Sequence, residues 1–267
     1  MSAESLAVML KALKLPGFVA HYEELAHLAE QSGWSFTEYL SQLVRIELEE
    51  RRTRRIERLR RGAALPEGKT LATLDVSLLP AKVKRQLPTL CGGGFVERAE
   101  NLLAFGLPGR GKTHLLSAIG NELVERGYKV LFISAVMLVQ RLLLAKQNLE
   151  LEKRLRRLDA FDAVIVDDIG YIQQSREEME VLFTFLSERY ERRSVMISSN
   201  LVFSQWDRIF KDAMTTAAAI DRVVHHSIIL ELTGPSVRGE EAKQRNTPPS
   251  RTSKKSKKTN KGEGVRP

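Results

Sequence analysis

Two groups of residues in this chain have types and spacing that suit phosphate chemistry, and the first is rich in glycine. In "GLPGRGKTHL", Gly106, Gly111, Lys112 and Thr113 match the pattern G-x-x-x-x-G-K-[ST]. Glycines let backbone N–H groups turn toward phosphate oxygens, and a helix that begins here adds its positive end. The lysine can reach the β and γ phosphates, while the threonine hydroxyl ligates magnesium. The pattern therefore predicts a nucleotide-binding loop.

The predicted nucleotide contacts cover this whole segment, and Thr113 is also a predicted metal ligand. A histidine just inside a helix that packs on a sheet is more often structural, so we assign no chemistry to the His114 side chain. The segment comprises Gly106, Leu107, Pro108, Gly109, Arg110, Gly111, Lys112, Thr113 and His114.

The second group is the pair of aspartates in "AVIVDDIGY". A nucleotide loop after one strand needs a carboxylate at the end of another to hold Mg²⁺, and Asp167 is predicted to do so, directly or through water. Asp168 then remains to activate the attacking water, although its side chain is shorter than that of glutamate. Because a misplacement on the order of 1 Å can cost about a hundredfold in rate, we expect slow hydrolysis, through a repositioned water or with help from Glu178. Alternatively, Asp168 only caps the following turn.

The elements that must position these groups form a repeating pattern. Short apolar, β-branched runs alternate with helix-length segments: "NLLAFG", "KVLFISA", "DAVIVDD", "SVMISSN" and "SIILEL". Such alternation predicts a five-stranded parallel sheet covered by helices on both faces, an α/β fold. Helices are expected from Thr113 to Arg126, across "VMLVQRLLLAKQNLELEKRL", from Ser175, which forms a capping box with Glu178, to about Arg192, and from about Thr215 to Val224.

Residues 1 to 65 are interpreted as a small helical module. Apolar spacing predicts one helix that ends before Pro16 and a second that ends at Gly33. Ser35 and Glu38 have the spacing of a capping box, which predicts the start of a long third helix.

This third helix carries eight arginines and four glutamates between residues 45 and 61. The pairs Glu47/Arg51, Glu50/Arg54 and Glu57/Arg61 are spaced i, i+4 and are expected only to solvate the helix. Arg51, Arg55 and Arg58 share one face, which suits phosphate contacts. The predicted DNA contacts are Arg51, Arg54, Arg55 and Arg58, and the alternative is a plain solvated face.

The rest of the chain divides by composition. Residues 66 to 98 contain glycines and prolines without a clear period and are interpreted as a connector, and residues 99 to 237 as the nucleotide-binding core. Residues 238 to 267 carry ten Lys and Arg against three Glu and no aromatic residue. This composition predicts a disordered basic tail that is attracted to phosphate or that serves only solubility.

Overall composition excludes several classes of protein. The chain has 267 residues, 43% of them hydrophobic, and a net charge of +9, which suits a globular protein. Its single cysteine, Cys91, has no disulfide partner or metal-ligand companions, so a buried inert thiol is expected. No apolar stretch approaches the roughly 18 residues of a membrane span, and charges interrupt the N-terminus. A cytoplasmic protein without a membrane partner is therefore expected.

Four blocks in order resemble the AAA+ ATPases of the IstB group: "GLPGRGKTHL", "VIVDDIGYIQQSREEMEVLF", "SSNLVFSQWDRIF" and "AAAIDRVVHHSII". These are ATP-binding helper proteins encoded beside the transposase of an insertion sequence, and the replicative helicase loaders of the DnaC type are more distantly similar. The resemblance covers most of residues 1 to 240. It implies an AAA+ variant of the P-loop NTPase fold, with ATP and Mg²⁺ as ligands.

The resemblance also implies further site residues. Asn200 stands where the family places a polar sensor of the γ-phosphate, and its amide can orient the attacking water. Arg222 matches an arginine given to the ATP of a neighbouring subunit, which implies a homo-oligomer with ATP at its interfaces; such a finger can be worth about 10³ to 10⁵ in rate. An internal salt bridge with Asp221 or another carboxylate is the alternative for Arg222. Arg238 resembles a further arginine of the family pattern, and no helical lid is expected after Leu232.

We therefore expect an ATPase that assembles on duplex DNA, engages a cognate transposase and hydrolyses ATP slowly as a switch. A helicase loader would use the same core and bind a helicase through the N-terminal module. A DNA-coating scaffold that binds ATP without hydrolysing it is an alternative of a different class. A small-molecule kinase fits least, because it would leave both basic segments without a use.

Overall fold

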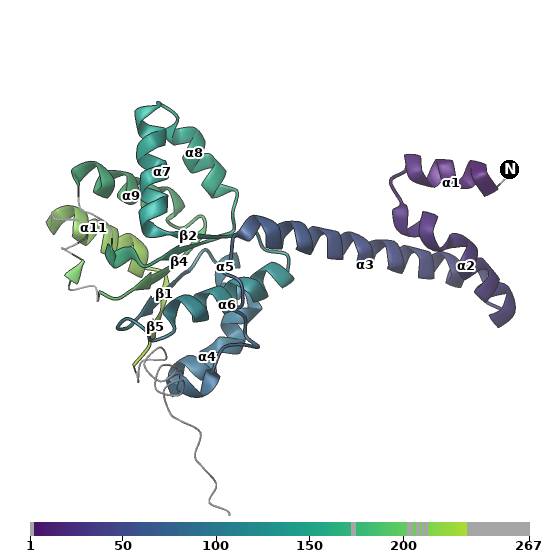
Figure 1. Ribbon diagram of the computed structural model, residues 1–267, viewed down its shortest axis with the longest axis horizontal. Coiled ribbons are helices and arrows are strands. Elements are labelled where there is room, and N and C mark those ends of the chain that lie inside the picture. Colours follow the sequence, from purple (N-terminus) through teal and green to yellow (C-terminus); the bar gives the residue numbers. More distant parts are fainter. Residues whose placement is uncertain (1–2, 172–174, 202–204, 207–208, 210–212, 234–267) are drawn as a thin grey trace, which may run out of the picture.

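The computed structural model describes residues 3–171, 175–201, 205, 206, 209 and 213–233 (Figure 1). Its centre is a five-stranded sheet in the order β2-β3-β4-β1-β5, in which every neighbouring pair is parallel. The predicted α/β fold is thus confirmed. The strands are β1 (Asn101–Phe105), β2 (Val130–Ser134), β3 (Ala163–Asp167), β4 (Ser194–Ser199) and β5 (Ser227–Glu231).

Alternate residues of the central strands enter two separate hydrophobic clusters, one on each face of the sheet. In β1, Leu102 and Ala104 belong to one cluster, while Leu103 and Phe105 belong to the other. Helices cover both faces of the sheet and exclude water from them. These strands are therefore continuous apolar runs and do not alternate apolar with polar residues.

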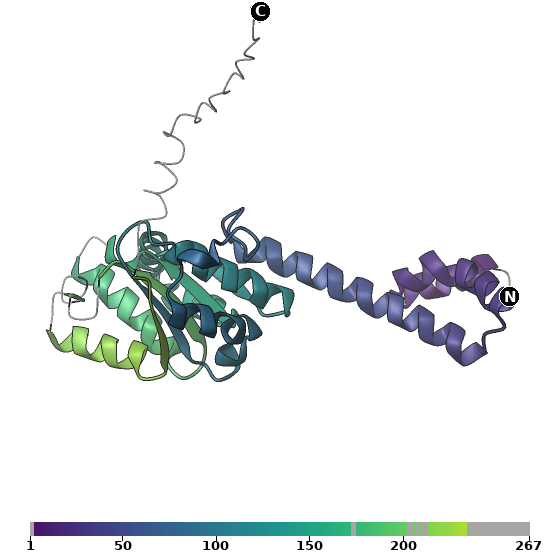
Figure 2. The same cartoon turned by 90° about the horizontal axis from the view of Figure 1, so that it is seen from below.

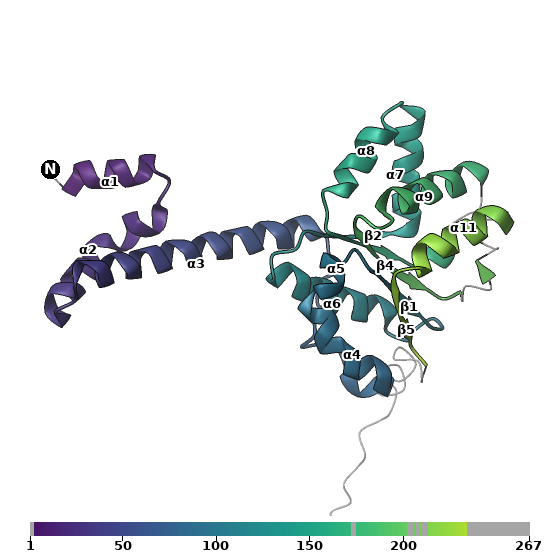
Figure 3. The same ribbon diagram turned by 180° about the vertical axis from the view of Figure 1, so that it is seen from behind.

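Two layers of helices supply this cover, as Figure 3 shows. One layer contains α4 (Ala81–Gly92), the short α5 (Gly94–Glu97) and α6 (Lys112–Glu125). The other contains α7 (Ala135–Gln147), α8 (Leu151–Asp159), α9 (Arg176–Arg189) and α11 (Ala213–Val224). Two short 3-10 helices, η1 (Val76–Leu78) and η2 (Ile169–Tyr171), precede α4 and follow β3, respectively.

The expected N-terminal helices form an arm. α3 (Phe36–Ala63) leaves the core as one long rod and carries α1 (Ala3–Ala12) and α2 (Pro16–Ser32) at its far end (Figures 1 and 2). α2 ends at Gly33, which has a φ of 67°, and α3 begins with the predicted capping box of Ser35 and Glu38. The other end of α3 is anchored because Ala63 is fully buried in the core.

One expected surface pair in this arm is a buried anchor, which corrects the prediction. The Glu47 side chain is only 5% exposed, accepts a hydrogen bond from the backbone N–H of Gly17 at 2.7 Å, and pairs with Arg51 at 2.6 Å. Arg51 also donates to the carbonyl of Lys14 at 2.8 Å. Spacing alone cannot show that α2 covers Glu47. Of the other two pairs, Glu50/Arg54 forms at 3.4 Å, and Glu57/Arg61 is absent from the ion pairs of the described residues.

The segment interpreted as a connector also differs from expectation. It contains η1, α4 and α5, and Val83, Leu87 and Leu90 of α4 pack in the same cluster as β1 and α6. Pro88 inside α4 and the glycines after it hide this helical period in the sequence. Cys91 lies in the same cluster, as predicted, and burial raises the pKa of its thiol to about 11.

The single helix expected across residues 136 to 155 is two helices, α7 and α8. The break falls at Leu149, which has a φ of 57°. A left-handed leucine is uncommon, so the sequence carries no signal for this turn.

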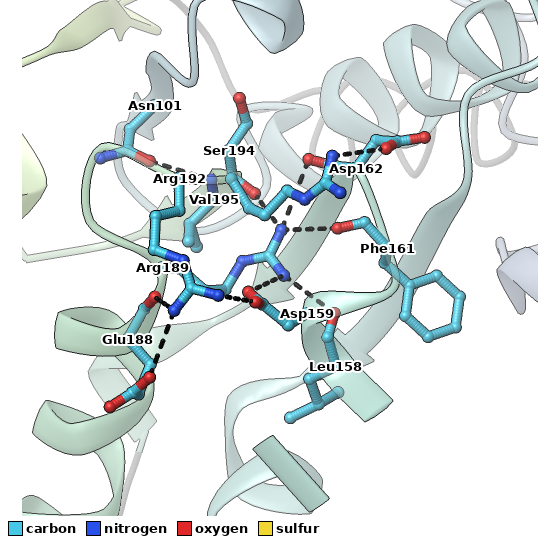
Figure 4. A network of polar contacts seen from close by, with 11 residues as sticks. Asn101, Leu158, Asp159, Phe161, Asp162, Glu188, Arg189, Arg192, Ser194 and Val195 are labelled. Carbon is cyan, nitrogen blue, oxygen red and sulfur yellow. Dashed lines mark hydrogen bonds and ion pairs between the residues drawn. The ribbon is translucent and has the colours of Figure 1, made fainter. Parts of the chain in front are cut away.

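A buried arginine ties together the edge of the sheet where the strands begin (Figure 4). Arg189, at the end of α9, is 2% exposed. Its guanidinium donates to the carbonyls of Leu158 at 2.9 Å, Phe161 at 3.0 Å and Ser194 at 2.9 Å. Burial lowers the pKa of Arg189 to about 10. Arg189 therefore joins the end of α8 to the starts of β3 and β4.

In the part of the chain that the structure describes, no helix is both long enough and apolar enough to cross a membrane. Arg238, the basic tail and part of "SSNLVFSQWDRIF" lie outside the described residues.

Candidate active site

The glycine-rich segment connects the carboxyl end of β1 to the first turn of α6. Gly109 and Gly111 both have a φ of 80°, which aims their N–H groups differently from those of a right-handed chain. A Cβ on Gly106 would lie 2.6 Å from the carbonyl oxygen of Leu232, so only glycine fits there. Leu107 and Pro108 are exposed at the tip of the loop.

Lys112 is the first residue of α6 and is only 5% exposed. Its Nζ atom donates to the carbonyl of Gly106 at 2.7 Å and to that of Leu107 at 3.2 Å. The charge is therefore held against the loop itself, where a phosphate chain would lie.

The donors of this loop fit a nucleotide. The first turn of α6 has no side-chain cap, because the capping residue is Gly111, so no capping side chain competes with an anion at this helix N-terminus. Thr113 follows Lys112 and is half-buried. The segment thus offers a helix N-terminus, an ammonium group and a hydroxyl, all close to one loop. These are the groups that bind the phosphates of ATP and Mg²⁺ in P-loop proteins.

The two aspartates lie at the same edge of the sheet. Asp167 ends β3, is 9% exposed, and accepts a hydrogen bond from the hydroxyl of Ser198 at 2.6 Å. Asp168 has a φ of 57°, and its backbone N–H donates to the same hydroxyl at 2.8 Å. The chain thus turns sharply at Asp168, so the two adjacent aspartates have different backbone conformations, one at the end of β3 and one in a left-handed turn.

Asn200 directly follows β4, between the ends of β3 and β1. Its Oδ1 atom is buried and has no hydrogen-bond partner in the described part of the chain. It packs against Gly170, where an added Cβ would collide with it. Gly106 donates from its N–H to the carbonyl of Ser199 at 3.3 Å, which links the glycine loop to this strand end. The loop, the aspartates and Asn200 therefore converge on one edge of the sheet.

Arg222 lies at the opposite edge. It is near the end of α11, and the carbonyl of Val223 beside it accepts a hydrogen bond from Asn101, the first residue of β1, at 3.0 Å. The glycine loop follows the other end of this five-residue strand, about 17 Å away at about 3.3 Å per residue. Arg222 stacks on Phe183, with its guanidinium carbon 4.7 Å from the ring centroid. The expected alternative, a salt bridge with Asp221 or another carboxylate, is not found among the described residues.

The C-terminal half of α3 and the segment between α3 and α4 both contact α6 or the residues just after it, and sequence reasoning missed these contacts. Arg55 donates to the carbonyl of Gly127, just beyond the end of α6, at 3.3 Å, and Asn121 donates to the carbonyl of Lys69 at 3.0 Å. The His114 ring lies 3.2 Å from the carbonyl of Thr70 and 3.1 Å from the hydroxyl of Thr73. The His114 side chain thus contacts the segment between α3 and α4, and no pattern in the sequence predicts this long-range contact.

The predicted DNA-contacting arginines differ in their surroundings. Arg51, Arg54 and Arg55 bind acceptors within the chain, whereas Arg58 is exposed and forms no ion pair within the described residues. A second basic surface, which we call the α7–α8 groove, was missed because its residues come from two helices. It is lined by Arg141, Asn148, Lys153, Arg154 and Arg157, among others.

Comparison with known proteins agrees with this geometry. The IstB-like ATP binding protein family matches residues 8 to 245. A protein of Sinorhizobium fredii named as an insertion sequence ATP-binding protein is 42% identical over 238 residues, which are 89% of this chain and 80% of that protein. The corresponding protein named for insertion sequence IS21 of Pseudomonas aeruginosa is 36% identical over 239 residues, 90% of each chain.

Solved structures share the fold of the core. DnaI matches with a TM-score of 0.54 at 20% identity, over 64% of this chain and 96% of that one. The DnaC helicase loader matches with a TM-score of 0.51 at 19% identity, over 62% and 98%. The family match spans both the arm and the nucleotide loop, and the core has the expected P-loop architecture of AAA+ proteins. The chain therefore belongs to the IstB-like family of ATP-binding proteins.

Proposed function

We propose that this chain is a DNA-binding ATPase that helps an insertion sequence to transpose. It assembles on duplex target DNA with ATP between subunits, engages the cognate transposase, and hydrolyses ATP slowly to end that state. The names of its relatives refer to insertion sequences and to ATP, which supports a role in transposition that depends on ATP. The likeness to helicase loaders is one of fold alone and does not favour a loader.

The separation of Arg222 from the glycine loop carries the proposal of an oligomer. The two lie at opposite edges of the sheet, so Arg222 cannot reach the ATP bound by its own chain. A neighbouring subunit that places its loop edge against this Arg222 would complete the site. Phe183 supports the guanidinium there without neutralising it, which leaves the charge for a γ-phosphate.

Within one site, each residue has a separate function. The ammonium of Lys112 and the first turn of α6 bind the phosphates, and the Asn200 amide orients the attacking water. The oxygen of that water attacks the γ-phosphorus, and Asp168 accepts a proton from the water. The bond between the γ-phosphorus and the β–γ bridging oxygen breaks, and ADP leaves with that oxygen. Magnesium, held by Thr113 and Asp167, would offset the charge of the phosphate oxygens. The short Asp168 side chain supports slow turnover, which suits a timed switch.

Two described surfaces support DNA binding. In the α7–α8 groove, Arg141, Arg154 and Arg157 form no ion pairs within the described residues, whereas Lys153 is paired with Glu150 at 2.7 Å. On α3, Arg58 is similarly unpaired. Arginines without a carboxylate partner can neutralise backbone phosphates without first breaking a salt bridge.

A salt titration of duplex binding tests these assignments. Log affinity should fall with log salt by about 0.9 for each phosphate contact, and Arg58→Ala and Arg154→Ala should each lower this slope by about one. Arg156→Ala is the control, because Arg156 on α8 already pairs with Glu152. A slope that none of the three changes would place the DNA contacts elsewhere.

The function itself is tested by ATP turnover per subunit at rising protein concentration, with and without duplex DNA. The rate should climb with concentration and climb further with DNA. ATP binding without turnover under every condition would mean that Asp168 is not a working base, and the non-hydrolysing scaffold would then replace this proposal. A pull-down of the cognate transposase tests whether the chain engages it. The transposase should be captured in the presence of ATP and not in the absence of nucleotide.

A further inference from the structure

The hydroxyl of Ser198 on β4 occupies a central position between the two aspartates. It donates to Oδ1 of Asp167 at 2.6 Å and accepts from the backbone N–H of Asp168 at 2.8 Å. Ser198 is fully buried. One side chain therefore contacts both the predicted metal ligand and the residue predicted to activate water.

Such a bridge requires a group that donates and accepts at the same time. A serine hydroxyl does both, whereas alanine does neither and a thiol does so weakly. The left-handed turn at Asp168 points its N–H toward β4, where the Ser198 hydroxyl accepts its hydrogen bond. Because Oδ1 of Asp167 is bound to Ser198, the rotation of the carboxylate is fixed and Oδ2 is left for another ligand.

We propose that Ser198 is a positioning residue that orients Asp167 toward the metal and holds Asp168 at the strand end. This inference rests on the proposed function, since it concerns the same site. The partners of metal-binding carboxylates act in this way in general, and their loss costs about 10-fold to 100-fold in metal affinity or activity. Neither residue type nor spacing marks Ser198, because the contact arises only when β3 and β4 pair.

The experiment measures the dissociation constant of a non-hydrolysable ATP analogue by calorimetry, once with Mg²⁺ and once with EDTA. The constant in EDTA divided by the constant with Mg²⁺ reports how much the metal strengthens binding. This ratio does not require turnover. For Ser198→Ala, the ratio should fall about 10-fold relative to wild type, while the constant in EDTA stays within about twofold. A residue that mattered only for folding would change both constants together.

Ser194→Ala is the matched control. Ser194 lies on the same strand and is equally buried, but its hydroxyl has no hydrogen-bond partner within the described residues. Its ratio should equal that of wild type. Ser198→Cys preserves the shape if alanine does not fold, and its ratio should lie between those of wild type and Ser198→Ala.

A wild-type ratio in folded Ser198→Ala or Ser198→Cys would overturn the proposal. The two failures are separable. If wild type never turns over ATP, the proposed function fails, but the effect of Mg²⁺ on analogue binding still reports on Ser198.

Discussion

Replacing Gly170 by alanine tests the position of Asn200 without touching either the nucleotide or Asn200 itself. Gly170 does not have a left-handed φ, so alanine is allowed by the backbone. The space is the obstacle, because the new Cβ would come within 3.0 Å of Asn200 Oδ1, whereas ordinary contacts begin at 3.4 Å. The Cγ atom of Leu201 would lie only 3.1 Å from the new Cβ, so the methyl group gains no room by moving toward Leu201.

The expected effect follows from this geometry. The new Cβ would lie well inside 3.0 Å of the Asn200 amide oxygen, so the amide must retreat by more than 0.4 Å to reach an ordinary contact of 3.4 Å. A misplacement on the order of 1 Å costs about a hundredfold in rate, so kcat should fall by about 10-fold to 100-fold, or about 1.4 to 2.7 kcal/mol in the barrier. The dissociation constant of ATP should change by less than about threefold, because the phosphate cradle lies on another strand.

The assay is steady-state ATP turnover beside analogue binding, for Gly170→Ala, Asn200→Ala and the double variant. Because the first change acts through Asn200, the double variant should be no slower than Asn200→Ala alone. Gly62→Ala is the control, since a Cβ there meets no atom within 4 Å. Full kcat in folded Gly170→Ala, or additive losses in the double variant, would refute the placement of Asn200 over the attacking water.

Three further predictions concern binding and stability. Lys112→Ala should weaken ATP binding at least about 100-fold in calorimetry, because the ammonium group held against the glycine loop is lost, while the melting temperature changes little. Arg189→Met should lower the free energy of unfolding in urea by about 3 kcal/mol, since two buried carbonyls and one part-buried carbonyl lose their donor. A loss under about 1 kcal/mol would contradict the network around Arg189. Burial raises the pKa of Glu47, but the hydrogen bonds from Arg51 and the Gly17 N–H outweigh burial and lower it below its ordinary value of 4.5. Glu47→Gln should therefore speed amide exchange in α2 and α3 at pH values above 4.5. Its difference from wild type should shrink as the pH falls below 4.5, because the stabilising carboxylate is lost as it protonates. An equal difference at all pH values would contradict this origin.

The sheet and the nucleotide loop were predictable because their signals are local. β-branched runs such as "AVIVDD" identify buried parallel strands, and the glycine-lysine pattern identifies the loop between β1 and α6. The capping boxes at Ser35 and Ser175 were likewise readable, since each depends on residues three positions apart.

What the sequence did not reveal depends on contacts between distant segments. Ser198 meets Asp167 only through the pairing of β3 with β4, and Glu47 is buried only because Gly17 approaches it. The break at Leu149 requires a left-handed leucine, for which no propensity exists. The position of Arg222 at the far edge of the sheet follows from chain connectivity, and it is this position that makes the trans contact testable.

Mixing two inactive variants tests the central claim most directly. Lys112→Ala binds ATP too weakly to fill its own site but still offers Arg222 to a neighbour, while Arg222→Ala binds ATP but offers no arginine to a neighbour. With duplex DNA present, each variant alone should show little turnover, and a mixture should regain a substantial fraction of the wild-type rate, because mixed neighbours form complete sites. Turnover that stays at the level of the separate variants, or an Arg222→Ala protein as active as wild type, would contradict an ATP site shared between subunits.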